Sequence, residues 1–424
     1  MKGLAREYTA RNDNDTMAAM LDTFPNASAQ RPPPQAAGPV RTAHSLQRDP
    51  KLAALELAAE LCHAHLGTVL FFCSAEYPLD ALGHALDEAF PNVPVSGCTT
   101  AGEITPAGYG RGCVVAIGFD RRAFTAAPAL IDNLESFDLL RAQCLVDTLL
   151  GECRRQSTVS VSDHSFALTL LDGLSSSEEQ VLATLDAALG SIPSFGGSAG
   201  DDNRLAHTYV YHQGRFHSQA AVVVMITTPL PFEVFSTHHL RPRDEKLVVT
   251  AADRHQRTVF ELNAAPAARE YARLVGREVT GLGEADFARH PLAVRIGEQF
   301  YVRSIQRVNT DDSLTFYCAV ENGIVLTAMQ PAPILADLEQ VLTGLESRLG
   351  PPALIVGCDC FLRRLAIEAL GEAQSASRLL RRWRAIGFNT YGEQHHGMHI
   401  NQTFTGVAIG HARPDAAGGT HHGA

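Results

Sequence analysis

Residues 389–410 read NTYGEQHHGMHINQTFTGVAIG, and the turn TYGE within them has two earlier counterparts. These are TAGE at 100–103 and SAGD at 198–201, so each turn has a hydroxyl, a variable residue, a glycine and a carboxylate. Glycine permits a positive φ or a close backbone approach, and the polar side chains can bond to turn amides. The pattern indicates three turns of one type, and the carboxylates of the first two need do no more than stabilise them.

The segments around the three turns also match one another. Each turn follows a strand and a helix and precedes another strand, and the three leading strands lie at 68–73, 166–172 and 353–360. Agreement of the flanking elements favours an internal duplication. We therefore predict a mixed α/β (α+β) fold of repeated strand, helix, turn and strand units, which form mixed sheets flanked by helices.

The remaining segments divide the chain. Residues 1–45 are rich in Asn, Gln, Ala and Pro and are predicted to be a disordered arm, and residues 413–424 are predicted to be a flexible tail. Interruptions of the apolar pattern by TTPLP and RPRDEK place a domain border between 46–235 and 236–412. After that border we expect strands joined by polar turns, and then a helix from about Pro266.

The composition limits the class of protein. The 424 residues are 45% apolar and carry a formal net charge of -11, which provides for a large core and argues against a nucleic-acid partner. The nine cysteines include no CxxC pair, and several lie in apolar runs, as expected for buried free thiols in a reducing compartment. The N-terminus lacks the apolar core of a signal peptide, and the longest strongly apolar run, AAVVVMI, is too short to span a bilayer. We expect a soluble cytoplasmic protein with no membrane partner.

Three histidines of the opening stretch, His395, His396 and His399, have the spacing of a metal site on a helix. Two glycines flank the cluster and disfavour a helix. The alternation that follows predicts one strand, with His399, Asn401 and Thr403 on the same face. Metal binding by the three histidines is therefore not favoured, although a zinc site with loop-plus-strand geometry stays open.

Two other positions are candidates for chemistry. Cys98 stands in a Gly-rich turn whose amides could lower a thiol pKa or form an oxyanion hole, but no histidine is placed as its base, so a small buried thiol is favoured. The pair His238 and His239 lies in FEVFSTHHLRP. On a strand these imidazoles point to opposite faces, so only one can enter a given pocket, and the alternative is a half-buried or surface pair at a strand end.

Three motifs together resemble one known family. The segments GCTTAGEI, FGGSAGDD and especially NTYGEQHHGMHINQTFTGVAIG are similar to the FIST sensory family, with its paired N-terminal and C-terminal FIST domains. The resemblance covers roughly residues 65–410. It implies a signal-sensing, ligand-binding protein rather than an enzyme, with the two FIST-type domains at 46–235 and 236–412.

One branch of this family resembles the chain more closely, namely haem-containing nitric-oxide sensors that act on histidine kinases or on cyclic-di-GMP enzymes (diguanylate cyclases or phosphodiesterases). Many FIST proteins carry Gly-Trp where this chain has histidine and leucine at 239–240. The resemblance therefore implies a non-covalent haem b held by His239, or alternatively by His238. A polar pocket around it would be lined by Tyr391, His399 and Asn401. A neutral imidazole can hold haem iron and leave the distal side open to nitric oxide.

The alternative is a FIST sensor that binds a small metabolite, such as an amino acid, without haem. The charged ends of that ligand would be bound by Glu393, Asn401, Thr403 and the amides of the Gly-rich turns. In either case the resemblance implies a partner signalling protein, and a homodimer is left open.

Overall fold

The computed structural model describes residues 38–202 and 204–412. The predicted tail at 413–424 and most of the predicted arm lie outside these residues. Within the arm, however, β1 (Val40–Ser45) forms an edge strand that pairs with β6 (Val114–Asp120). The prediction of a disordered arm up to residue 45 is wrong for this segment, because its backbone groups are satisfied by the sheet.

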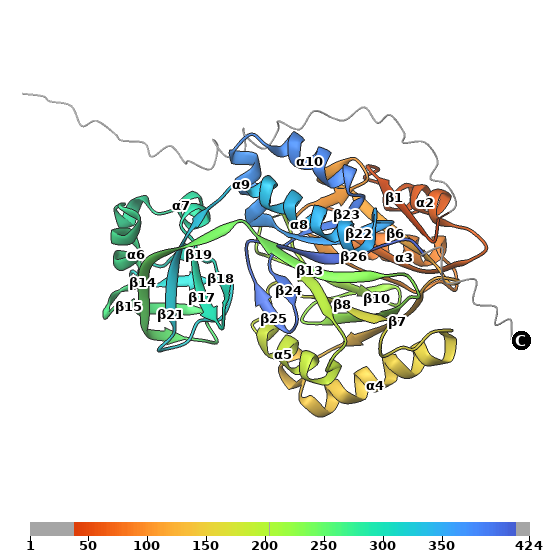
Figure 1. The fold of residues 1–424 in the computed structure, drawn as a ribbon, viewed down its shortest axis with the longest axis horizontal. Coiled ribbons are helices and arrows are strands. Elements are labelled where there is room, and N and C mark those ends of the chain that lie inside the picture. The colour runs from red at the N-terminus through yellow and green to blue at the C-terminus, as the bar shows by residue number, and fades with distance from the viewer. Residues whose placement is uncertain (1–37, 203, 413–424) are drawn as a thin grey trace, which may run out of the picture. The chain divides into compact units, whose positions relative to one another are not determined.

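Three six-stranded mixed sheets share one arrangement of strands (Figure 1). In each, a helical crossover joins two parallel strands, and an antiparallel strand lies beside the first of them. These elements are β2 (Leu66–Ser74), α3 (Leu79–Ala89), β3 (Val95–Thr100) and β6 in the first unit; β8 (Ser165–Leu171), α5 (Glu178–Leu189), β9 (Ser194–Ser198) and β12 (Ala221–Thr227) in the second; and β22 (Leu354–Cys360), α9 (Phe361–Ala369), α10 (Ala373–Arg382), β23 (Ala385–Thr390) and β26 (Thr403–Ile409) in the third. The predicted fold class and the three repeated units are confirmed.

Each unit also begins with an outer strand and a helix. The outer strands are β1, β7 (Thr125–Ile131) and β13 (Phe232–His238), each antiparallel to the last strand of its own unit. The helices are α2 (Pro50–Leu61), α4 (Leu139–Gln156) and α8 (Ile334–Leu349). Capping side chains start two of them, since Asp49 accepts from Leu52 N at 2.9 Å and Asp138 accepts from Arg141 N at 2.9 Å.

The turn of each unit continues into a hairpin that joins the sheet of another unit. These hairpins are β4 (Glu103–Thr105) with β5 (Gly108–Gly110), β10 (Val210–His212) with β11 (Arg215–His217), and β24 (Glu393–His395) with β25 (Met398–Ile400). β4 pairs with β23, β10 with β3 and β24 with β9. The first unit thus extends the sheet of the third, the second that of the first, and the third that of the second. The predicted domain border at 235/236 falls inside β13, so it does not separate two independent sheets.

The prediction of a single strand after His396 is wrong, because the structure has two strands there. β25 and β26 are two separate strands, and the extended backbone is interrupted between them at Gln402, which has a φ of 55°. β25 extends the second sheet, whereas β26 belongs to the third. His399 and Thr403 therefore do not share one continuous strand face.

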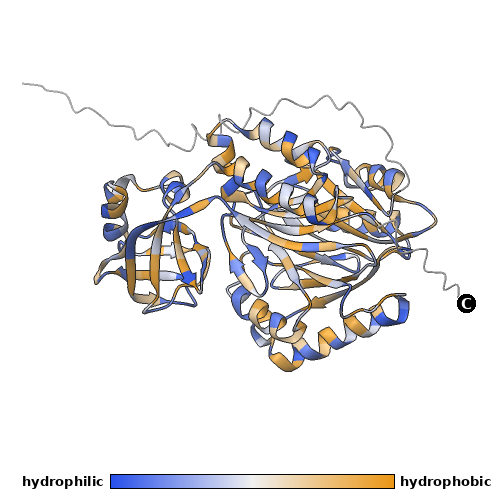
Figure 2. Ribbon diagram, in the orientation of Figure 1, coloured by the Kyte–Doolittle hydropathy of each residue, from blue (hydrophilic) through white to orange (hydrophobic). Residues whose placement is uncertain are grey.

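The inner faces of the three sheets form one common core. It contains residues of all three units, including Leu168 and Val356, and the rings of Phe72 and Phe388 stack at 4.5 Å. Each fully buried aromatic side chain contributes roughly 1.5–3 kcal/mol through removal of apolar surface from water. The outer faces are covered by helices, and Figure 2 shows polar residues on the outward side of α4. Within the part of the chain that the structure describes, no helix combines the length and the apolar character that a membrane crossing needs.

An inserted segment, residues 240–331, lies between β13 and α8 and is drawn in green and teal in Figure 1. It has an eight-stranded sheet and its own apolar core. Its elements are β14 (Leu240–Asp253), β15 (Thr258–Leu262), β16 (Ala265–Pro266), α6 (Ala267–Val275), α7 (Glu284–Arg289), β17 (Leu292–Ile296), β18 (Gln299–Arg303), β19 (Ile305–Val308), β20 (Leu314–Phe316) and β21 (Val325–Pro331). The predicted strands and the helix that follows Pro266 are confirmed.

Candidate functional site

The three Gly-rich turns contact one another directly. Each is bonded to the next through the backbone, in the pairs Ala101 N to Asn389 O (2.9 Å), Gly200 N to Thr99 O (3.0 Å) and Tyr391 N to Ser198 O (3.3 Å). A Cβ at Gly200 would lie 2.6 Å from Ala101 N, so this turn requires glycine for the close approach of two backbones. The repeated motif therefore builds the centre at which the three units meet.

The carboxylates of the first and third turns are closed off by their own neighbours. Glu393 is fully buried, and its Oε2 accepts from Thr403 N at 3.0 Å and from Thr403 Oγ1 at 2.8 Å, while Thr390 donates to Oε1. Burial raises the pKa of Glu393 to about 8 and that of Glu103 to about 7. The predicted ligand-binding residues Glu393 and Thr403 are thus bonded to each other and close the turn.

The second turn differs because its carboxylate bonds to a loop and to the third turn. Asp201 accepts from three consecutive backbone amides at 205–207 and from the hydroxyl of Tyr391. The Tyr391 ring packs on Phe361 with centroids 5.2 Å apart. Tyr391, predicted to line a pocket, therefore joins the second and third turns.

A buried polar cluster lies where the inserted segment contacts the second and third units, and we call it the junction cluster. Its members are Glu178, Glu179, Arg257, Cys318 and His399. Arg257 Nη2 donates to Glu178 Oε2 at 2.8 Å, and His399 Nδ1 lies 3.3 Å from Glu179 Oε1. The side chains of Glu178 and His399 are 1% and 2% exposed, so these charges are almost removed from water.

The charges of the junction cluster stabilise one another. Burial alone would lower the pKa of His399, but Cys318 and the two glutamates raise it well above its usual value. Burial would raise the pKa of Glu179, but His399 and Arg257 lower it well below its usual range. Burial raises the pKa of Glu178, and the neighbouring His399 and Arg257 oppose that rise. Each buried carboxylate thus faces a cationic partner, which is the pairing that buried charges require.

Two further predicted residues adjoin this cluster. Cys318 Sγ lies 2.9 Å from Asn401 Oδ1, and Asn401 Nδ2 donates to the backbone oxygen of Tyr391 at 3.4 Å. Arg303 of the inserted segment donates to the backbone oxygen of His399 at 3.0 Å. The structure therefore places His399 and Asn401 near the backbone of Tyr391, whereas the Tyr391 side chain bonds to Asp201. A polar pocket lined by these three residues stays a prediction.

The other members of the cluster were not predicted. Glu178 and Glu179 begin a helix, where acidic residues are ordinary because they complement the helix dipole. Arg257 and Cys318 carry no local motif, and Arg257 is 79 positions away from Glu178. No signal within one segment of the sequence joins these side chains.

His239 and His238, the predicted haem ligands, lie elsewhere. His239 is 3% exposed, and its Nδ1 lies 3.1 Å from Nη1 of Arg363, which pairs with Asp359 at 2.8 Å. Burial and the neighbouring Arg363 lower the pKa of His239 to about 2. A guanidinium only donates, so Nδ1 accepts and Nε2 carries the proton.

That tautomer is the opposite of the one that an iron ligand requires, in which Nδ1–H donates and Nε2 offers its lone pair. His238 has the same arrangement, because its Nδ1 accepts from Leu240 N at 3.3 Å. The two histidines therefore do not fit an axial haem ligand in this structure. Their partners differ from those of His399, so the predicted site is not brought together as a whole.

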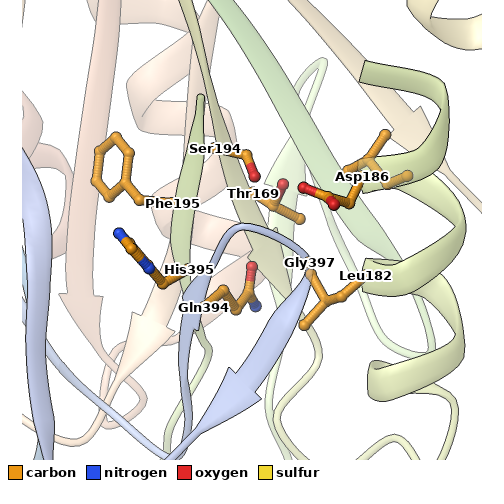
Figure 3. Close-up of a pocket in the computed structure, with 9 residues that line it drawn as sticks. Thr169, Leu182, Asp186, Ser194, Phe195, Gln394, His395 and Gly397 are labelled. Atoms are coloured by element: carbon orange, nitrogen blue, oxygen red, sulfur yellow. The ribbon is translucent and has the colours of Figure 1, made fainter. Parts of the chain in front are cut away.

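A small pocket opens between α5, β9 and the β24–β25 hairpin (Figure 3). Its cavity volume is about 10 Å³, which is room for about one water molecule. It is lined by Thr169, Leu182, Leu185, Asp186, Ser194, Phe195, Gln394, His395 and Gly397. Burial and the neighbouring His396 lower the pKa of His395 to about 4, so the imidazole that faces this pocket is neutral. Two of the three clustered histidines, His395 and His399, thus lie on different sides of one hairpin.

Cys98 does not have the environment of a nucleophile. Its side chain is fully buried in the common core, and burial raises its pKa well above the usual value of a thiol. The cysteines of the described residues are all free, and seven of the nine are buried, as predicted.

The fold and these sites define a class of protein: repeated α/β units with an inserted segment, a small pocket beside the β24–β25 hairpin, and no accessible nucleophile at Cys98. Residues 67–265 match the FIST N domain and residues 267–396 match the FIST C domain. The chain therefore belongs to the FIST family, whose domains are sensor domains of signal transduction.

The chain is also similar to the uncharacterized protein MJ1623 of Methanocaldococcus jannaschii. The two are 21% identical over 272 residues, which is 63% of this chain and 50% of that protein. The chain thus spans about half the length of this relative.

Proposed function

We propose that this protein is a sensor for a small, amine-bearing metabolite such as an amino acid. The ligand binds in the pocket of Figure 3, and its binding is passed through the inserted segment to a partner signalling protein. The observation that supports this is the position of the β24–β25 hairpin. Gln394 and His395 line the pocket, while His399 on the returning strand contacts Glu179 in the junction cluster.

The pocket lining indicates the ligand class. Leu182, Leu185 and Phe195 provide apolar walls, and Asp186 provides a carboxylate that no hydrogen bond within the described residues engages. The buried Oε1 of Gln394 also lacks a partner there. A carboxylate and an amide oxygen suit an ammonium group, and the cavity of about 10 Å³ admits a small metabolite only when the hairpin moves away from α5.

Ligand binding must move the hairpin. A Cβ at Gly397, in the hairpin turn, would lie 2.6 Å from Cβ of Asp186, so the hairpin packs directly on α5. A ligand that inserts here favours a conformation in which the hairpin is displaced, and His399 then changes its distance from Glu179. The ligand shifts the population of the two conformations by its difference in affinity for them.

A thermal-shift screen of amino acids and small amines tests this proposal. A true ligand at 100 times its Kd stabilises the fold by about 2.7 kcal/mol and raises Tm. Asp186→Asn should abolish the shift, whereas Asp147→Asn, an exposed aspartate on α4, should keep it. If no compound raises Tm, or if Asp186→Asn responds like the unchanged protein, the proposal is overturned.

Haem binding with nitric oxide as the signal is the competing proposal from sequence. Its ligand assignment requires His239 to give up Arg363, because the present tautomer does not fit iron. Haem added to the purified protein should then give a stoichiometric Soret band that shifts with nitric oxide. That band should be lost in His239→Ala and kept in His84→Ala, an exposed control on α3. If both variants keep the Soret band, His239 is not the haem ligand.

For the partner we propose a cytoplasmic histidine kinase or cyclic-di-GMP enzyme, as the sequence resemblance implies. Co-purification from the native cell with tagged protein tests this choice. Recovery of neither enzyme class would contradict it.

A further inference from the structure

We propose that Glu179, Cys318 and His399 form a binding site for a divalent transition-metal ion, with Zn²⁺ as the ion whose preferences they match. Each residue offers one ligand atom, and the three atoms lie within 4.8 Å of one another. The thiol of Cys318 is fully buried and His399 is 3% exposed, whereas Glu179 is partly exposed and lies on the side open to solvent. This proposal does not rest on the metabolite proposed above.

The donor types and their separation fit such an ion. Zinc binds thiolate, imidazole and carboxylate at about 2.0–2.3 Å, so neighbouring ligand atoms of a tetrahedral site are about 3.3–3.6 Å apart. Nδ1 of His399 and Oε1 of Glu179 are already 3.3 Å apart. Three protein ligands leave a fourth position for water or for a ligand from solution.

Neighbouring groups hold the three donors in place. The amide of Ala319 donates to Glu179 Oε1 at 2.7 Å, and Asn401 Oδ1 lies 2.9 Å from Cys318 Sγ. Gly392 leaves room for the imidazole, since a Cβ there would lie 1.8 Å from Nε2 of His399, and within the described residues Nε2 has no hydrogen-bond partner. The glycine of the third turn therefore lets the ring approach until Nδ1 faces the other two donors.

The surrounding charges accommodate a dication. Arg257 lies 2.8 Å from Glu178 and 3.3 Å from Glu179, so its single charge balances one of the two carboxylates. The other carboxylate and the thiolate of Cys318 then balance the two positive charges of the metal. On binding, the protons on Nδ1 of His399 and on Sγ of Cys318 leave to water, because these ligands must be deprotonated. With the metal bound, two carboxylates and one thiolate balance the guanidinium and the dication, so the cluster has no net charge. Without the metal, two carboxylates balance the guanidinium and a protonated His399, so the net charge is the same.

The three ligands come from segments that are far apart in sequence. Glu179 begins α5 of the second unit, Cys318 follows β20 of the inserted segment, and His399 lies in β25 of the third unit. A metal bound here would tie the inserted segment to the hairpin. Binding is thus expected to stabilise the junction itself.

Cobalt substitution tests the proposal with a readout of its own. The full-length protein is stripped with a chelator and titrated with Co²⁺, and its absorption spectrum is followed. One Co²⁺ per chain should bind and give a thiolate-to-cobalt charge-transfer band together with the intense visible bands of tetrahedral cobalt. Zn²⁺ should displace it stoichiometrically.

Variants identify the ligands. Cys318→Ser should remove the charge-transfer band, and Glu179→Gln, which preserves shape, should weaken Co²⁺ binding by more than about tenfold. Cys144→Ser, an exposed cysteine on α4, is the matched control and should bind as the unchanged protein does. Circular dichroism establishes that each variant is folded.

Two outcomes would overturn the proposal. One is the absence of stoichiometric Co²⁺ binding with a charge-transfer band. The other is an unchanged spectrum and affinity in a folded Cys318→Ser or Glu179→Gln protein. Either result would leave the three residues as an ion-paired contact between segments.

Discussion

Two buried glutamates of this protein have opposite environments. Glu393 in the third turn is surrounded by hydroxyls and one amide of Thr390 and Thr403, and burial raises its pKa to about 8. Glu179 in the junction cluster faces His399 and Arg257, which lower its pKa well below the usual range despite burial. One residue type thus stays neutral in a closed turn and is charged at a contact between segments.

The comparison distinguishes a carboxylate whose hydrogen bonds are local in sequence from one whose bonds depend on distant segments. The turn carboxylate is satisfied within ten residues of its own position, so its bonds form whenever the unit folds. The junction carboxylate depends on partners 78 and 220 positions away, so its bonds require the inserted segment and the hairpin to be in place. We therefore expect substitutions at the junction to cost more stability than a substitution in the closed turn.

The largest effect is expected when the junction loses its guanidinium. Arg257→Ala leaves the buried carboxylate of Glu178 without its cation, which should lower the free energy of unfolding by about 3–5 kcal/mol. Urea denaturation measures this loss. Arg254→Ala is the matched control from the same turn, because its pair with Glu321 is half exposed and should cost less than about 1 kcal/mol. Equal losses in the two variants would contradict the charged junction.

A smaller loss is expected for the partner of His399. Glu179→Gln removes hydrogen bonds to charged groups and should cost about 1.5–3 kcal/mol at pH 7. The folded-state pKa of Glu179 is lowered below its usual 4.5, so its contribution is present above that value and is lost as pH falls. The difference between the unchanged protein and Glu179→Gln in urea denaturation should therefore shrink below about pH 4.5. A constant difference down to low pH would show that this carboxylate is not ion-paired.

The link between turn and junction is tested at Gly392. In Gly392→Ala the new Cβ would meet Nε2 of His399 at 1.8 Å, so the ring must move, at a cost of about 1–3 kcal/mol. Thermal unfolding measures this cost. Gly281→Ala has nothing within 4 Å and serves as the control with little change. A neutral Gly392→Ala would mean that the ring does not depend on this glycine.

The smallest effect is expected in the closed turn. Glu393→Gln resembles the neutral carboxyl and should change the free energy of unfolding by less than about 1 kcal/mol at pH 4, where the carboxyl is protonated. The pKa of Glu393 is raised from 4.5 to about 8, so its contribution is complete below 4.5 and is lost as pH rises towards 8. The unchanged protein should therefore lose more stability between pH 5 and pH 8 than Glu393→Gln does. The reverse order would show that Glu393 is ionised in the folded state.

The sequence alone determined the repeated unit, because each part of it is local. Alternating and helical apolar patterns, Gly-rich turns and the helix start at Pro266 all depend on neighbours within a few residues. The three units, the strands and helix that follow the second unit, and the turn-stabilising role of Glu103 and Asp201 were therefore predictable. Tyr391, His399 and Asn401 belong to one conspicuous motif, so their proximity along the chain follows from the sequence, while a pocket lined by them stays a prediction.

Only the tertiary structure decided which unit receives each hairpin and which charges meet at the junction. The turn after β9 could have folded back on its own sheet, but β10 pairs with β3 of the first unit. The same exchange ends β25 at Ile400 and turns an apparently continuous strand into two. Glu178, Arg257 and Cys318 become neighbours because three units and the inserted segment pack together. Packing over such separations depends on how whole surfaces fit and how buried charges are paired, and no local pattern encodes either.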